Sequence, residues 1–260
     1  MLRQESEKEG IPMPVAMDIV LGLPANEKIH RAMGSIMQGA LMEILDGESA
    51  NKLHEEGLRP YTQYLYFDKN KNLPIWRVNS LNDWAYEKIS VPLTRQRQIF
   101  LRHKNYRVNL LEHKITAAES YSDIAAKFMN DFAPICRGVE INFVTTTSFR
   151  REGQYVIFPE IYLLIQSLIN RWNKFAEGFR IEDDISHMLA TFCRIKEYNL
   201  RTQNFMLEHQ KINGFCGNMT IKFEGNNIIN NLLGLLFEYA NYSGVGIKTA
   251  LGMGAIKANL

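Results

Sequence analysis

One histidine stands where acid–base chemistry is possible. His54 closes a predicted short helix and precedes the turn that Gly57 and Pro60 impose. An imidazole has an unperturbed pKa of roughly 6.5, so it can take a proton from a ribose 2′-hydroxyl, or give one to a leaving 5′-oxygen, near neutral pH without a metal. A lone histidine is more often a surface or capping residue, so position alone leaves both interpretations open. The others keep the surface interpretation: His103, His113, His187, His209 and, as a reserve candidate at the first helix start, His30.

A second candidate is the glycine-rich segment from Ser243 to Gly254 (SGVGIKTALGMG). It does not match a P-loop, because Ile247 separates the lysine from the preceding glycine, nor a dinucleotide fingerprint, because Thr249 stands where the third glycine is needed. We therefore expect no cofactor. An unhindered backbone beside a lysine suits RNA phosphates, whereas the alternative is a helix cap followed by a bulged strand. The RNA-binding candidates in this segment are Gly244, Gly246, Lys248, Gly252 and Gly254.

Basic residues concentrate from Arg95 to Arg107, interleaved with aromatic side chains. Such a stretch can hold phosphates and stack bases, or it can be the solvent face of a strand and its loop, and the sequence does not choose between the two. Two adjacent arginines beside Gly153 are a second possible phosphate contact with the same alternative. The candidates are Arg95, Arg97, Arg102, Lys104, Arg107, Arg150 and Arg151.

Metal-dependent and serine-hydrolase chemistry have little support. Glu182, Asp183 and Asp184 are the only carboxylate cluster, and no histidine or cysteine stands nearby at ligand spacing. A solvated face is the simpler interpretation of this cluster. The nucleophile-elbow pattern G-x-S-x-G is absent from the sequence. We expect no metal site.

The composition is that of a globular protein. The chain has 260 residues, 46% hydrophobic and 22% charged, and a formal charge of +2, so a nucleic-acid site has to be local. Three widely spaced cysteines argue against a disulfide framework and fit a reducing cytoplasm. The first ten residues are polar, and no apolar run reaches about 18 residues, so we expect neither a signal peptide nor a membrane span.

The hydrophobic pattern predicts the order β-α-β-β-α-β twice. Alternation over 15–21 predicts the first strand, and apolar residues from Ile29 to Leu45 predict a helix with Asn26 as N-cap and Gly47 just past its end. We therefore expect an α+β fold of two tandem ferredoxin-like domains with antiparallel sheets, over residues 1–130 and 131–260. The other predicted helices are 49–56, 81–89, 121–130, one beginning at 161, and 228–239; the other strands are 61–67, 73–78, segments within 98–115, 139–143, 194–207, 215–223 and 253–258.

In four blocks the sequence resembles the CRISPR-associated endoribonuclease family, which cuts precursor CRISPR RNA at its repeats. The histidine block is the more specific, whereas the terminal glycine block is shared by the wider repeat-associated RNA-binding superfamily. The blocks span most of the chain: Gln38–Leu41; Leu53–Tyr61 (LHEEGLRPY); Phe143–Phe158 with Ser167–Asn173; and Gly214–Gly217 leading to Ser243–Gly254.

The resemblance implies two ferredoxin-like domains and metal-independent cleavage that leaves a 5′-hydroxyl and a 2′,3′-cyclic phosphate. His54 matches the family's usual catalytic histidine. Some members add a tyrosine in the first helix and a lysine after the histidine; here Met42 stands at the tyrosine position and Arg59 is the nearest cation. Either Arg59 or Lys52 would stabilise charge on the phosphorane or only bind phosphate.

The function we expect is therefore a repeat-specific, metal-independent endoribonuclease. The main alternative is a non-catalytic RNA-binding subunit that retains guide RNA in a CRISPR effector complex, and a ferredoxin-like metabolic enzyme is a remote third. The expected partners are CRISPR repeat RNA, other effector subunits and a second copy of the chain in a homodimer. We expect a cytoplasmic protein without a membrane partner.

Overall fold

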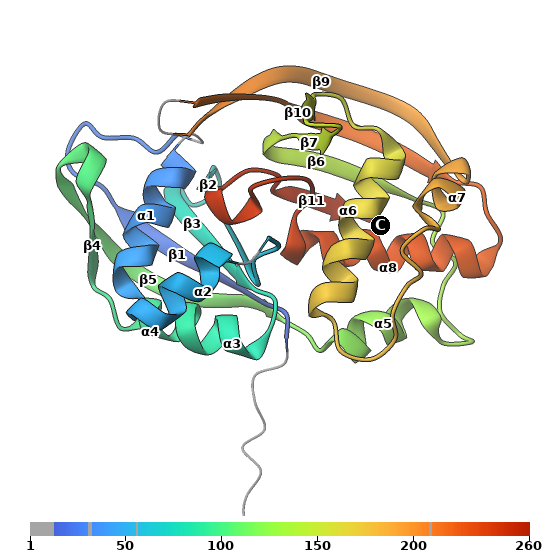
Figure 1. Ribbon diagram of the computed structural model, residues 1–260, viewed down its shortest axis with the longest axis horizontal. Coiled ribbons are helices and arrows are strands. Elements are labelled where there is room, and N and C mark those ends of the chain that lie inside the picture. Colours follow the sequence, from blue (N-terminus) through green and yellow to red (C-terminus); the bar gives the residue numbers. More distant parts are fainter. Residues whose placement is uncertain (1–12, 31–32, 56, 208–209) are drawn as a thin grey trace, which may run out of the picture.

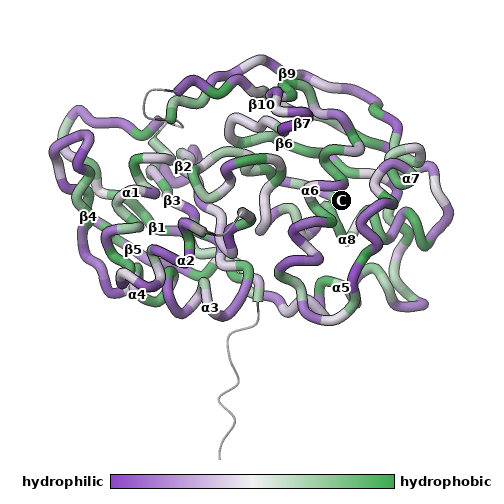
Figure 2. Tube along the Cα trace, in the orientation of Figure 1, coloured by the Kyte–Doolittle hydropathy of each residue, from purple (hydrophilic) through white to green (hydrophobic). Residues whose placement is uncertain are grey.

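Each half of the chain folds around its own antiparallel sheet (Figure 1). The structure, a computed structural model, describes residues 13–30, 33–55, 57–207 and 210–260. The charged leader and the predicted helix end at Glu56 lie outside these residues. Hydrophobic and hydrophilic residues alternate along the chain in both halves (Figure 2), as expected where strands and helices bury one face.

The first sheet has the strand order β2-β3-β1-β5-β4. Without the edge strand β4, the order is that of a ferredoxin-like β-α-β-β-α-β unit, which confirms the predicted class. Its core is packed with Trp76, Met37 and Leu41. The elements are β1 (Val15–Gly22), α1 (Gly34–Ile44), α2 (Gly47–Glu55), β2 (Tyr61–Asp68), β3 (Leu73–Ser80), α3 (Asp83–Ala85), the π-helical turn η2 (Tyr86–Ser90), α4 (Val91–Thr94), β4 (Gln98–Leu101), the 3-10 turn η3 (Arg102–Lys104) and β5 (Tyr106–Ala118).

The predicted start of the first helix is wrong. Asn26 has φ 69° and lies in a turn closed by the Glu27 amide, which donates to the Pro24 carbonyl at 3.1 Å. Asparagine tolerates this left-handed backbone, so the same residue type that favours helix caps serves a turn here. Helix α1 begins at Gly34, and Gly47, predicted to follow its end, instead begins α2.

The second sheet has the order β11-β6-β10-β9, again the ferredoxin-like one. Helices α6 and α8 pack their apolar faces on it around Trp172 and Tyr239. Helix α5 lies before the expected boundary at residue 130, yet Tyr121 and Ile124 belong to this second core. Helix α7 was not predicted. The elements are α5 (Tyr121–Met129), β6 (Gly138–Thr147), β7 (Phe149–Arg151), β8 (Gln154–Val156), α6 (Ile161–Phe175), α7 (Ser186–Thr191), β9 (Cys193–Leu207), β10 (Gln210–Phe223), α8 (Asn227–Ser243), the 3-10 turn η4 (Thr249–Leu251) and β11 (Ile256–Asn259).

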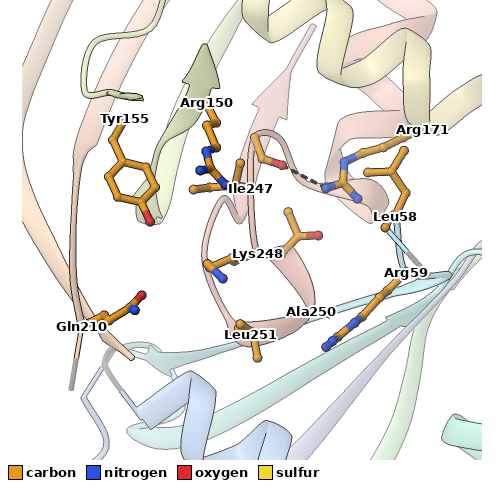
Figure 3. A pocket seen from close by; sticks show the side chains of 13 residues that line it. Leu58, Arg59, Arg150, Tyr155, Arg171, Gln210, Ile247, Lys248, Ala250 and Leu251 are labelled. Carbon is orange, nitrogen blue, oxygen red and sulfur yellow. Dashed lines mark hydrogen bonds between the residues drawn. The ribbon is translucent and has the colours of Figure 1, made fainter. Parts of the chain in front are cut away.

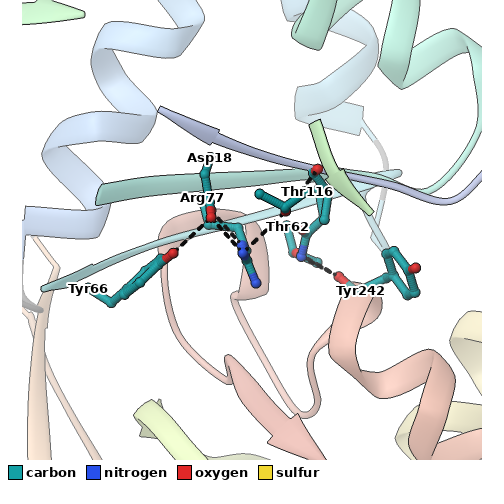
Figure 4. Close-up of polar contacts among 8 residues, drawn as sticks. Asp18, Thr62, Tyr66, Arg77, Thr116 and Tyr242 are labelled. Atoms are coloured by element: carbon teal, nitrogen blue, oxygen red, sulfur yellow. Dashed lines mark hydrogen bonds and ion pairs between the residues drawn. The ribbon is translucent and has the colours of Figure 1, made fainter. Parts of the chain in front are cut away.

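Polar groups of the first sheet hold the end of α8. The side chains of Thr62 and Asn79 both donate to the Tyr242 carbonyl at 2.8 Å (Figure 4). Nearby on the same sheet, Arg77 forms a bidentate pair with Asp18, with both N–O distances 2.7 Å. These bonds tie the C-terminal helix to the first domain.

The fully buried Gln63 is a second link between the domains. Its amide nitrogen donates to the Gly34 carbonyl at 2.8 Å and to the Ala250 carbonyl at 3.1 Å, and its oxygen accepts from the Trp76 indole at 2.8 Å. A side chain at Gly34 would lie 2.5 Å from the Leu251 carbonyl oxygen, so glycine is what allows this close approach. The C-terminal loop therefore docks directly on the start of α1.

Candidate active site and RNA interface

His54 lies exposed in the last turn of α2, where the fully buried Leu53 anchors the helix. The helix start is held by Asp46, whose carboxylate accepts from the Ser49 amide at 2.7 Å; this bond holds the pKa of Asp46 below its usual range. His54 faces a cavity of about 570 Å³, which we call the histidine hollow. Its lining is His30, Ser35, Ile36, Gln38, Gly39, His54, Arg59, His103, Lys104, Met206, Leu207 and Leu251.

Three histidines line this one hollow. His30 and His103, like His54, are exposed, and Lys104 lies beside them. Partial burial and the charge of Lys104 lower the pKa of His30, although Glu27 acts in the opposite direction. His30 is therefore neutral near pH 7 and able to accept a proton. Two imidazoles in one cavity are enough for a base and an acid to act on the same phosphate.

The two candidate cations beside His54 are placed differently. Arg59 lines the histidine hollow. The Lys52 ammonium instead lies 4.4 Å from the centre of the Trp84 ring, and Lys52 does not line the hollow. This geometry favours Arg59 over Lys52 as the group that meets charge on a reacting phosphate.

A second cavity adjoins the first and is lined by four cations (Figure 3). Arg59 and Leu251 line both cavities, so the two share part of their wall. We call the second one the arginine hollow. Its lining, taken over the described residues, contains no carboxylate: Gly57, Leu58, Arg59, Arg150, Tyr155, Arg171, Gln210, Gly246, Ile247, Lys248, Thr249, Ala250 and Leu251. An anion is the ligand that such a cavity attracts.

The glycine-rich segment divides between the two interpretations that the sequence left open. Gly246 and Lys248 line the arginine hollow, and Lys248 is exposed with φ 57°. Gly244, Gly252 and Gly254 are buried. Gly244 caps α8 with φ 60°, so this glycine serves the helix end rather than a ligand.

Few of the other predicted phosphate contacts reach the hollows. Lys104 lines the histidine hollow and Arg150 the arginine hollow. The remaining predicted arginines lie outside both linings: Arg95 and Arg97 are exposed, Arg102 pairs with Glu43 at 2.7 Å, Arg107 lies over the Phe100 ring, and Arg151 bonds Glu160 and the Tyr162 hydroxyl.

Sequence reasoning missed Arg171, Tyr155 and Gln210, all of which line the arginine hollow. The sequence does hold a signal for Arg171, because it interrupts the apolar stripe of α6 one turn after Leu168. A charged residue at a core position of an amphipathic helix indicates a buried charge with a specific task. Tyr155 and Gln210 carry no comparable signal.

Two features are absent from the described residues. None of the helices found there is long and apolar enough to cross a membrane. Nor do three or more His, Cys, Asp or Glu side chains in that part of the chain stand where they could hold a metal ion together.

The RNA-binding RRM is built on a four-stranded sheet, so tandem ferredoxin-like domains with a cation-lined cavity between them suit the class of nucleic-acid-binding proteins. The family model described as CRISPR-associated endoribonuclease Cas6 matches residues 141–256. The Cas6 endoribonuclease of Streptococcus thermophilus is 31% identical over 220 residues, which are 84% of this chain and 88% of that protein. That of Mycobacterium tuberculosis is 24% identical over 245 residues, 92% of this chain and 77% of that protein. The chain belongs to the Cas6 family of CRISPR-associated endoribonucleases.

Solved structures agree with the fold. A Cas6 product complex superposes with a TM-score of 0.79 at 22% identity, covering 95% of this chain and 99% of that one. Cas6 of Thermus thermophilus superposes with a TM-score of 0.73 at 21% identity, covering 96% and 100%. A Cas6-related protein of Pyrococcus furiosus gives 0.62 at 13% identity, covering 95% and 98%. The two ferredoxin-like domains are therefore shared across these proteins.

Proposed function

We propose that this protein cleaves precursor CRISPR RNA within its repeats by attack of a ribose 2′-hydroxyl on the adjacent phosphate, without a metal. The observation that carries the proposal is that the two hollows adjoin at Arg59 and Leu251: His54 stands exposed in one, and cations line the other. The histidine hollow then holds the scissile nucleotide. The arginine hollow holds the backbone beside it.

The reaction needs two proton transfers at one phosphorus. A base removes the 2′-hydroxyl proton while the 2′-oxygen bonds to phosphorus, and an acid protonates the 5′-oxygen as the P–O5′ bond breaks. His54 performs one transfer, and His30 is the nearest candidate for the other because it lines the same hollow. Arg59 stabilises the negative charge that develops on the phosphorane oxygens. The products carry a 5′-hydroxyl and a 2′,3′-cyclic phosphate.

Positioning supplies much of the rate. The 2′-oxygen, the phosphorus and the leaving oxygen have to come nearly into line, a conformation that A-form stacking disfavours. RNA hairpins are recognised mainly by shape and unpaired bases by their edges, so contacts in the arginine hollow fix the repeat while His54 acts at one phosphate. The scissile nucleotide is distorted in the process.

A non-catalytic role, in which the protein only retains guide RNA in an effector complex, remains the second candidate. This alternative is supported by Met42, because some family members have a tyrosine of the catalytic set at that position. The arginine hollow would hold RNA in either case. In either role we also propose that the protein binds other effector subunits, pairs with a second copy of the chain and is cytoplasmic. The three free cysteines fit a reducing compartment.

Replacing the ribose at the cut site by 2′-deoxyribose separates the two roles. We expect cleavage to vanish, because the nucleophile is gone, and binding to stay within about twofold, because one hydroxyl contributes little to a contact dominated by phosphates. Cleavage is followed on a denaturing gel and binding by filter retention, with a 2′-deoxy substitution two nucleotides away as control. Cleavage of the substituted RNA at the same bond would rule out 2′-hydroxyl attack.

Chelation tests the absence of a metal. The rate in excess EDTA is expected to equal the rate in magnesium within about twofold, because imidazole alone is able to move both protons. The measurement is a single-turnover rate on the unmodified repeat at constant ionic strength. A loss of activity that added magnesium or manganese restores would overturn the metal-independent mechanism.

A further inference from the structure

Arg171 is an unusual residue for its place in the fold. It lies in α6 between buried apolar side chains and is 2% exposed. One of its terminal nitrogens donates to the Gly246 carbonyl at 3.0 Å. Its Nε and its other terminal nitrogen are buried without a hydrogen-bond partner. The side chain also lines the arginine hollow.

No carboxylate in the lining of this hollow neutralises Arg171, as far as the described residues go. Burial lowers its pKa to about 10, so the guanidinium still carries its charge at neutral pH. A buried charge without a partner destabilises the fold, and this cost falls when a counter-ion binds. The unpaired guanidinium therefore favours an anion in the cavity in front of it.

The remaining lining narrows the kind of anion. Arg150 from β7, Arg59 from the segment before β2 and Lys248 from the glycine-rich segment surround the same space (Figure 3). Tyr155 and Gln210 add a hydroxyl and an amide, which suit a ribose or a base edge. Several cations with neutral polar groups beside them match a sugar–phosphate unit better than a carboxylate.

We infer that the arginine hollow binds one phosphate of the RNA backbone, separate from the phosphate that is cut, and that Arg171 is its positioning residue. Arg171 holds the carbonyl of Gly246, and so the loop that carries Lys248, and it places a fixed positive charge beneath that loop. The Gly246 amide in turn donates to the Ser167 hydroxyl, one turn earlier on α6, at 2.8 Å. This inference rests on the proposed function, because the ligand is the same RNA.

The test neutralises one phosphate at a time. A non-cleavable repeat RNA, with 2′-deoxyribose at the cut site, is made in versions that carry a single methylphosphonate at successive positions. Binding of each version is measured to the unaltered protein, to R171M and R171K, and to R150M. Arg150 is exposed, so R150M is the variant expected to fold without difficulty. K174M, which removes an exposed charge from the same helix, is the matched control.

One methylphosphonate position is expected to weaken binding to the unaltered protein and to K174M by roughly tenfold, the size of one charge-assisted contact. At that position, and at no other, the loss of affinity caused by the methylphosphonate shrinks to about twofold or less in R171M and in R150M. The reason is that the arginine and the phosphate charge that it contacts or positions are energetically coupled, so removing one leaves little for the other to lose. R171K is expected to fall between, since it keeps the charge and loses the planar fork. The slope of log affinity against log salt should drop by about 0.7 to 0.9 in R150M.

Two results would overturn the inference: equal penalties in every variant at every position, which is what a purely structural Arg171 predicts, or coupling of R171M and R150M to different phosphates. If R171M does not fold, R171K and R150M decide on the same criterion. If the protein cleaves unmodified RNA but no phosphate is coupled to Arg171, the phosphate site is wrong and the proposed function stands. If one phosphate is coupled but unmodified RNA is not cleaved, the phosphate site stands and the proposed cleavage is wrong.

Discussion

His54→Ala is expected to lower the single-turnover rate of repeat-RNA cleavage by about a hundred- to ten-thousand-fold, the usual contribution of one positioned acid or base. His54 is exposed in the histidine hollow, so removing its ring leaves the α2 packing at Leu53 untouched. Affinity for RNA should change by no more than about twofold, because we propose that most of the phosphate contacts lie in the adjoining hollow. The loss then appears in the rate and not in binding.

His187→Ala is the matched control. The variant removes the same imidazole ring, here from α7. The His187 ring stacks on Tyr162 at a centroid distance of 4.3 Å, and neither residue lines a hollow. We expect the control to cleave at the unaltered rate. A His54→Ala protein that cleaves as fast as the control would remove His54 from the mechanism and leave His30 as the histidine to test.

The fold was largely predictable because its signals are local. Strand alternation, the turn between β2 and β3 and the apolar stripe of α6 each lie within about fifteen residues. The start of α1 was not predictable in this way, since Asn26 suits both a helix cap and a left-handed turn, and the local sequence does not choose between them.

The site was less predictable because it is assembled from distant parts of the chain. Local sequence singled out His54 and Lys248, but only the fold shows that Arg59 and Leu251 line both cavities. Local charge was a poor guide, since a cationic run does not reveal which side chains face a cavity. Of the five arginine and lysine side chains from residue 95 to 107, all within the described residues, Lys104 alone lines one of the two hollows.

Gln63→Leu is expected to lower the free energy of unfolding by about 3 kcal/mol or more. The substitution keeps the buried volume and removes three hydrogen bonds, and it leaves the Ala250 carbonyl and the Trp76 indole nitrogen buried without the partner that Gln63 supplies. Each orphaned buried group costs about 1–3 kcal/mol. Urea denaturation followed by tryptophan fluorescence measures the change, and Gln98→Leu, an exposed glutamine on β4, is the control that makes the same chemical change.

Gln63→Leu is also expected to slow cleavage under conditions where the protein stays folded. Gln63 bonds the Ala250 carbonyl in η4, and the next residue, Leu251, lines both hollows. Loosening this turn lets the arginine hollow shift relative to His54, and misplacement by about an ångström is enough to cost a hundredfold in rate. RNA affinity should fall less than the rate, because Arg150 and Arg59 are held by other elements. A rate and an unfolding midpoint equal to those of Gln98→Leu would show that this bridge does not align the two hollows.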